Sequence, residues 1–172
     1  MPKDSADLHV ERWRDHWVDI RFDEQVEAVA VRLNRLTRYL DDITRRAVAE
    51  IGLQDFEYHT LHTLMVRDTP GRASPTALAR DMGVSPAGIT GRVDGLERKG
   101  FVKRVPGKAD RRTVDVEVTR AGADVWRRAM ALRGHAEEDL AGALSRKELG
   151  TLNRLLKKLT LHVEGRQGPL KP

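Results

Sequence analysis

The sequence contains no cysteine, and this absence excludes several kinds of chemistry. Without a thiol, the chain has no disulfide, no thiol redox sensor and no cysteine nucleophile. It also lacks an apolar run close to the roughly 20 residues that a membrane-spanning helix needs. The first residues, MPKDSADLHVERWRDHW, have no apolar core of the kind that a signal peptide carries. We therefore expect a cytoplasmic protein with no membrane association.

Signals of catalysis are missing as well. We find no nucleophile–base pair, no glycine loop that would cradle a phosphate and no metal-binding signature. The sequence therefore predicts a binding protein that is not an enzyme and needs no cofactor.

What the sequence does have is an excess of positive charge. Its 172 residues carry a formal net charge of +5, and the isoelectric point is about 9.8. This balance favours an anionic partner such as nucleic acid, although a basic protein of any function shows it too.

Apolar residues spaced by three and four predict long helices at both ends of the chain. These stripes lie within residues 6–20, 26–51, 120–141 and 145–163. Trp13 and Trp17 lie on the first stripe, so we expect this added N-terminal helix to dock on another element. The flanking helices have more apolar face than one small domain covers, and we expect a symmetric dimer interface built from both chain ends.

The central region has the signals of a winged helix-turn-helix. The segment PTALARDM follows Ser74, and SPAGITGRVDGLERKG begins with Ser85 as N-cap and ends at Gly100. Two helices joined by a tight turn containing glycine are typical of a helix-turn-helix. The short β-type runs FVKRV and TVDVEV flank the polar turn PGKADRR, which predicts a hairpin, or wing.

We therefore predict a mainly α fold with a small β-wing. Its segments are an added N-terminal helix with a long dimerisation helix (1–54), a winged helix-turn-helix DNA-binding lobe (55–119), C-terminal dimerisation helices (120–164) and a disordered tail (165–172).

The second helix of the helix-turn-helix has an apolar stripe and an opposite face rich in glycine. Glycine costs up to about 1 kcal/mol inside a helix, so three glycines here favour close approach to another backbone, such as the floor of a major groove. Packing of these glycines against neighbours inside the fold is the alternative. Asp94 on this face would repel phosphate unless it contacts a basic side chain or accepts a hydrogen bond from cytosine.

The wing turn carries basic residues on an exposed tip, where arginine can enter a minor groove or hold phosphate. We expect Asp110 to hold one of these guanidinium groups, and a solvated charged turn is the alternative. The predicted DNA-contacting residues of the helix and the wing are Ser85, Ala87, Gly88, Thr90, Gly91, Arg98, Lys108, Arg111 and Arg112.

Residues 78–122 resemble the MarR family of winged-helix transcription regulators, most specifically in the wing DRR followed by VTRAG. The resemblance implies a homodimer with both termini in its interface. It also implies binding to a pseudo-palindromic operator in double-stranded DNA, usually as a repressor, and release by a small anionic or phenolic ligand.

The added N-terminal helix is similar to that of the urate-responsive subgroup, whose pocket holds Trp, Asp, Arg and Arg. Matching by motif places the tryptophan at Trp17, with Trp13 as second choice, and the arginines at Arg92 and Arg104. The acid of the subgroup falls at His59, a departure from its pattern. Because histidine does not repel an anion, we expect a ligand more anionic than urate, such as a di- or tricarboxylate. Both arginines could instead hold phosphate or internal acids.

The segment DFEYHTLHTL places His59 and His62 three residues apart on one helix. They could be core-edge or interface residues that bind nothing, His59 could line a ligand pocket, or the pair could bind a metal. A zinc site would need at least one further ligand, which the motif does not supply.

The main alternative function is a winged helix that binds another protein and has no sequence-specific DNA binding. The basic tip KADRR argues against it.

Overall fold

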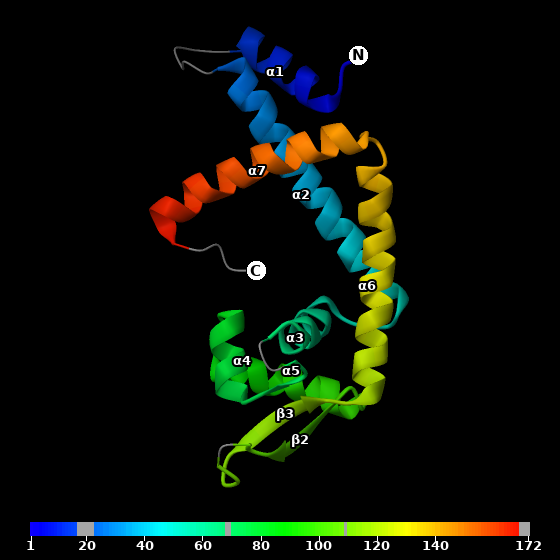
Figure 1. The fold of residues 1–172 in the computed structure, drawn as a ribbon, viewed down its shortest axis with the longest axis vertical. Coiled ribbons are helices and arrows are strands. Elements are labelled where there is room, and N and C mark those ends of the chain that lie inside the picture. Colours follow the sequence, from blue (N-terminus) through cyan, green and yellow to red (C-terminus); the bar gives the residue numbers. More distant parts are fainter. Residues whose placement is uncertain (17–22, 68–69, 109, 169–172) are drawn as a thin grey trace. The chain divides into compact units, whose positions relative to one another are not determined.

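The computed structural model describes every residue except 17–22, 68–69, 109 and 169–172. Figure 1 shows its elements, which in chain order are α1 (Ser5–His16), α2 (Glu24–Glu50), α3 (Asp55–Met65), β1 (Arg72–Ala73), α4 (Pro75–Met82), α5 (Pro86–Arg98), β2 (Val102–Pro106), β3 (Val114–Val118), α6 (Arg120–Ala141) and α7 (Arg146–Gln167). The chain forms two compact units, Met1–Ala131 and Leu132–Pro172, with the boundary inside α6. The predicted mainly helical fold with a small β-wing is confirmed.

Local sequence signals set the ends of α4 and α5. The side chains of Ser74 and Ser85 accept hydrogen bonds from the backbone N–H groups of Ala77 and Gly88, and a proline follows each cap. Gly83 ends α4 with a φ of 63°, a left-handed conformation that favours glycine. The tight turn of the helix-turn-helix is therefore specified by these few residues.

The wing belongs to a three-stranded antiparallel sheet with the order β1-β3-β2. β2 and β3 pair from Val102↔Val118 to Pro106↔Val114. The two residues of β1 pair with Glu117 and Val116. The sequence predicted a breaker rather than a strand in this segment, because two residues are too short to show a periodic pattern.

The core of the first unit lies where α3, α4, α5 and α6 meet the sheet. Its fully buried side chains include the predicted stripe of α5 and the apolar face of α3. The main contributors are Tyr58, Leu61, Leu64, Leu78, Ile89, Val93, Leu96, Val102, Val116, Val125 and Ala129. This packing fixes which face of α5 points outward.

Two helices leave apolar side chains uncovered. α2 buries only Ala47 and Val48 among its residues and exposes Val26, Val29, Leu33, Leu36 and Tyr39. α7 buries none of its residues and exposes Leu152, Leu155, Leu156 and Leu159. These stripes match the predicted excess of apolar face.

The predicted disordered tail is partly wrong, because α7 continues through residues 165–167. Glu164, Arg166 and Gln167 are good helix formers and carry the helix past Gly165. Residues 169–172 lie outside the described part of the chain. Within the described ranges, no helix combines the length and hydropathy needed to cross a membrane.

Candidate nucleic-acid interface

The outward face of α5 holds the small and polar side chains predicted to meet DNA. Ser85, Ala87, Gly88, Thr90, Gly91 and Arg98 are solvent-accessible, whereas Ile89, Val93 and Leu96 are buried. The N-terminal half of the helix therefore presents short side chains to solvent.

The glycines of α5 differ in what surrounds them. A Cβ built at Gly91 meets no described atom within 4 Å, and one built at Gly95 lies 3.7 Å from Glu57 Oε1, an ordinary contact. At Gly88 the added atom would lie 3.2 Å from Ser85 Oγ, close to the cap. Packing among the described residues thus gives no reason for glycine at position 91.

Asp94 contacts a basic side chain, the first of the two alternatives raised by the sequence. Arg104 Nη2 donates to Asp94 Oδ1 at 2.5 Å, and its other terminal nitrogen pairs with Glu97. The hydrogen bond to Asp94 raises the pKa of the Arg104 guanidinium above its usual value. The negative charge of Asp94 is therefore compensated beside the outward face of α5.

The proposed ligand arginines contact separate groups. Arg104, on β2, lies against the two acids of α5, while the Arg92 guanidinium carbon lies 5.9 Å from the centre of the Phe56 ring. His59 is exposed and lies 3.5 Å from Asp55. Trp17 is outside the described residues. Arg104 is thus already bound to internal acids, as the alternative interpretation of the sequence allowed.

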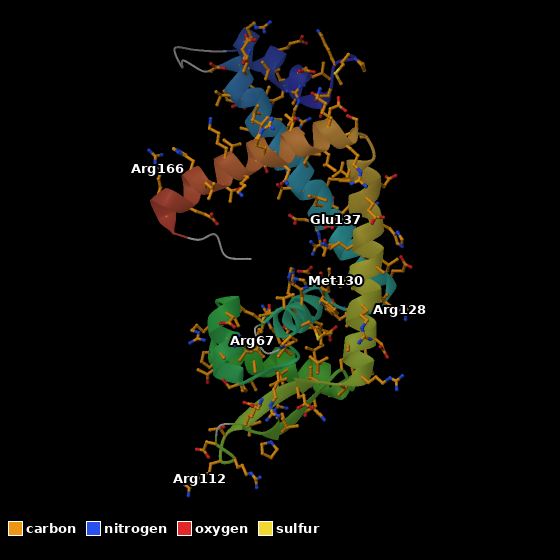
Figure 2. All side chains as sticks on the ribbon, viewed as in Figure 1. Arg67, Arg112, Arg128, Met130, Glu137 and Arg166 are labelled. Atoms are coloured by element: carbon orange, nitrogen blue, oxygen red, sulfur yellow. The ribbon has the colours of Figure 1, made fainter. Side chains whose placement is uncertain are left out.

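The wing turn presents Lys108, Arg111 and Arg112 to solvent, and Figure 2 shows Arg112 at its tip. Asp110 accepts a hydrogen bond from the backbone N–H of Arg112 at 2.8 Å, whereas the sequence predicted that it would hold a guanidinium. A short carboxylate two residues before an N–H reaches the backbone more readily than a long, exposed side chain.

Gly107, at the base of the turn, leaves no room for a side chain. A Cβ there would overlap the side chain of Thr113 and the carbonyl oxygen of Asp110. The tip is therefore built on a closely packed turn rather than on an open loop.

The histidine pair has two separate environments. His62 Nδ1 accepts a hydrogen bond from Trp126 Nε1 at 3.2 Å, and the His62 ring stacks on Tyr58 with 5.5 Å between centres. His62 therefore joins α3 to α6 at the edge of the core. Among the described residues, no three histidines, acids or cysteines gather in an arrangement that could hold a metal.

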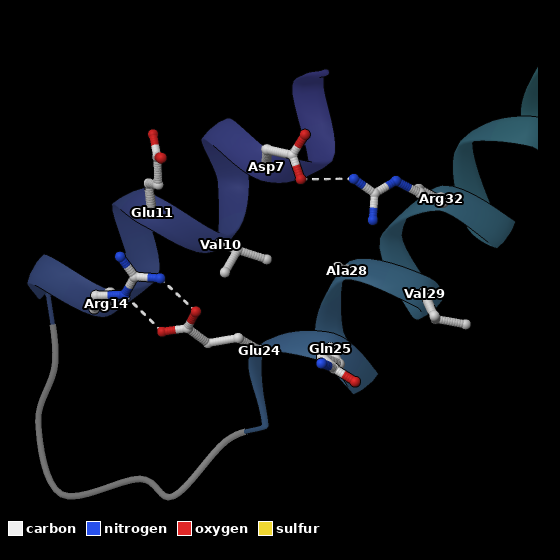
Figure 3. A pocket seen from close by; sticks show the side chains of 9 residues that line it. All are labelled: Asp7, Val10, Glu11, Arg14, Glu24, Gln25, Ala28, Val29 and Arg32. Atoms are coloured by element: carbon white, nitrogen blue, oxygen red, sulfur yellow. Dashed lines mark hydrogen bonds and ion pairs between the residues drawn. The ribbon is translucent and has the colours of Figure 1, made fainter. Parts of the chain in front are cut away.

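Several ion pairs join α1 to α2, and Ala6 and Val10 of α1 are buried. Arg14 donates to Glu24, and Arg32 donates to Asp7 at 2.6 Å and to Asp4 at 2.8 Å, as Figure 3 shows in part. Between these pairs lies an open cavity of about 460 Å³ whose lining includes Val10 and Ala28. The Arg32 hydrogen bond lowers the pKa of Asp4 to about 2.

Two contributors to the interface region escaped the sequence reasoning. Glu57 is buried, caps α3 by accepting from Gln54 N–H, and binds Lys99 Nζ at 2.6 Å, so it holds the end of α5. Arg72 binds groups at the base of the wing. An acid in a first helical turn and an arginine in a breaker segment carry no sequence signal of these contacts.

Comparison with known proteins agrees with this geometry. Residues 56–114 match the model of the MarR family. The HTH-type transcriptional regulator PecS of Dickeya dadantii is 27% identical over 154 residues, which cover 90% of this chain and 92% of PecS.

Solved structures share the fold. The YusO protein from Bacillus subtilis has a TM-score of 0.69 at 20% identity, over 81% of this chain and 97% of that chain. A mutant of S. aureus MepR bound to an oligodeoxyribonucleotide has a TM-score of 0.62 at 16% identity, over 83% of this chain and 99% of that chain. Together, the matched segment and the solved structures show that this chain has the winged-helix fold of MarR-type proteins, and PecS, which is similar along most of the chain, is a transcriptional regulator.

Proposed function

We propose that the chain acts as a homodimeric repressor that binds a pseudo-palindromic operator and that a small anionic ligand releases it from this DNA. The observation that carries the DNA-binding part is the outward face of α5, where small residues and Gly91 lie exposed and unpacked. A helix with such a face can approach base edges in a major groove closely. The basic tip at Lys108, Arg111 and Arg112 would then hold phosphate or enter the adjacent minor groove.

The exposed apolar stripes of α2 and α7 support the dimer. They hold several large side chains, including Leu33, Leu36, Leu155 and Leu159, that the described chain leaves in water. Contiguous apolar surface of this kind is usually covered by a partner, and a second copy would also supply the second recognition helix. Two copies of α5 would then read the two half-sites of the operator.

For the ligand, we propose an anion such as a di- or tricarboxylate, bound with the help of Trp17, His59, Arg92 and Arg104. α1 precedes the long α2, which supports the likeness to the urate-responsive subgroup. An anion that competes for Arg104 would release Asp94 and Glu97, the acids that now bind it. Two free carboxylates beside the outward face of α5 would repel phosphate, so ligand binding and DNA binding would oppose each other.

The DNA-binding part is tested with a duplex taken from upstream of the chain's own coding region. Arg112→Ala should weaken binding at every sequence tested and lower the slope of log affinity against log salt by about 0.9, the value for one phosphate contact. Arg127→Ala serves as control, because Arg127 is an exposed arginine of α6 that pairs with Asp124. An unchanged slope for Arg112→Ala would remove its phosphate role. A parent chain that leaves every duplex unshifted would favour the protein-interaction module instead.

The ligand part is tested by thermal melts with di- and tricarboxylates, urate and neutral aromatic compounds. The carboxylates should raise the melting temperature of the parent chain more than that of Arg104→Met, since the variant lacks the guanidinium. If only neutral aromatic compounds stabilise the chain, the anion proposal is wrong.

A further inference from the structure

Arg72 is the first of the two residues of β1, and its side chain binds both other strands of the sheet. Its Nε donates to Asp115 Oδ2 at 2.9 Å, and its Nη2 donates to the carbonyl oxygen of Pro106 at 2.6 Å. Its Nη1 lies 3.4 Å from Glu117 Oε2. The three donors of one planar group thus join the end of β2 to two positions of β3.

Two of these partners form the base of the wing turn. Pro106 ends β2, directly before Gly107. Asp115 Oδ2, which accepts from Arg72, also accepts from the backbone N–H of Lys108 at 3.2 Å. The guanidinium therefore contacts both sides of the hairpin at the point where the turn begins.

The other end of this connection is the helix-turn-helix. Ala73 follows Arg72, and Ser74 is the N-cap of α4. β1 itself contributes only the register Arg72↔Glu117 and Ala73↔Val116, so its backbone pairing is short. The side chain of Arg72 extends that pairing and ties the start of the helix-turn-helix to the wing.

The contacts of Arg72 are well suited to this task. Its side chain is 25% exposed and that of Asp115 is 15% exposed, so water competes less with these bonds than with surface ion pairs. A guanidinium is rigid and holds several acceptors in one plane, which a lysine ammonium cannot do. Lys103, by contrast, pairs with Glu117 at 2.8 Å across the same sheet and is 54% exposed.

We propose that Arg72 is a positioning residue that sets the direction of the basic wing tip relative to α4 and α5. It need not touch DNA, and it acts through Pro106, Asp115 and the backbone of Lys108. This inference rests on the proposed function, in which the wing tip contacts DNA.

The first experiment measures affinity for the upstream duplex and its salt slope in Arg72→Met, which keeps most of the length of the side chain and removes the donors. We expect affinity to fall about tenfold. The salt slope should fall by an amount equivalent to about two phosphate contacts, because the whole tip loses its placement. Lys103→Met is the matched control, since it removes one cation and one partner of Glu117. Its slope should change by no more than one contact.

Arg72→Lys separates charge from bracing and serves as the test if Arg72→Met fails to fold. It keeps the net charge but loses the planar set of guanidinium donors, so DNA affinity should remain clearly below that of the parent chain. Parent-like affinity in Arg72→Lys would show that charge alone matters and would overturn the proposal. Circular dichroism and melting temperature verify that each variant is folded.

A double-mutant cycle with Arg112→Ala distinguishes positioning from a general loss of stability. If Arg72 acts through the tip, DNA affinity in the double variant falls by clearly less than the product of the fold-reductions in the two single variants. A fold-reduction in the double variant equal to that product would overturn the proposal. If Arg112→Ala weakens binding and Arg72→Met does not, only the positioning role fails. If Arg112→Ala has no effect, wing contact with DNA fails, and the positioning role fails with it.

Discussion

At the scale of single residues, Gly122 marks a place where two stretches of backbone meet. Gly122 lies in the first turn of α6, in the motif VTRAG, and is buried. A Cβ built there would overlap the carbonyl oxygen of Phe101. The start of α6 therefore packs directly on the backbone that enters β2, and this contact explains the glycine of the motif.

Gly122→Ala should destabilise the protein by about 1–3 kcal/mol, because backbone atoms cannot move aside as a flexible side chain can. Urea unfolding measures the change. Gly134→Ala in the same helix is the control: no described atom lies within 4 Å of its added Cβ, so a gain of up to about 1 kcal/mol is expected. Equal stability of the two variants would contradict the role assigned to Gly122.

At the scale of elements, α5 has one face that packs in the core and an opposite, exposed face that would meet DNA in the proposed function. Its apolar stripe is buried in the core, whereas a Cβ at Gly91 on the other face would contact none of the described residues. A helix that only needed to fold would be more stable with alanine at position 91.

Gly91→Ala should therefore stabilise the free protein by up to about 1 kcal/mol while it weakens DNA binding, since the added methyl group lies where the groove would approach. Thermal unfolding and a gel shift with the upstream duplex measure the two effects. A variant that is more stable and binds DNA as well as the parent would show that α5 does not approach DNA through Gly91.

α1 offers a second prediction at this scale, because ion pairs hold it on α2. The pKa of Asp4 falls from 3.8 to about 2 beside Arg32. A lowered folded-state pKa contributes stability above pH 3.8 that is lost as the pH falls towards 2. Hydrogen exchange of residues 5–16 should therefore quicken relative to the rest of the chain over this interval, and also in high salt, which screens exposed pairs.

Arg32→Met should produce the same loosening of α1 at neutral pH. Arg45→Met, which removes an arginine paired with Asp42 inside α2, should not. Slow exchange throughout α1 in Arg32→Met would mean that the contacts of Ala6 and Val10 hold the helix without the ion pairs.

The sequence predicted most elements of this fold and fewer of its contacts. Caps and apolar spacing are local signals, so Ser74, Ser85 and the stripe of α5 were identified correctly. β1 has only two residues and exists because β3 lies beside it. The pairing of Arg104 with Asp94 likewise depends on how β2 lies against α5, which no local pattern encodes.

At the scale of the whole molecule, the uncovered stripes predict self-association. Leu156→Glu places a charge in the apolar stripe of α7 and should shift the sedimenting species from two chains towards one, because burying an unpaired charge is unfavourable. Affinity for the operator should fall with it, since linked half-sites bind more tightly than separate ones.

Leu161→Glu is the matched control, because Leu161 is an exposed leucine of α7 that does not belong to the stripe of Leu152, Leu155, Leu156 and Leu159. The same sedimentation profile for parent, Leu156→Glu and Leu161→Glu would mean that α7 is not part of the interface.

α7 buries none of its own residues, and this has a consequence for how the protein is made. If a second copy covers its leucines, part of the folding free energy comes from assembly, and the apparent melting temperature rises with protein concentration. A newly synthesised chain that has not met its partner then displays these leucines to chaperones and proteases. The cellular amount of the protein would in this way help to decide how much of it survives.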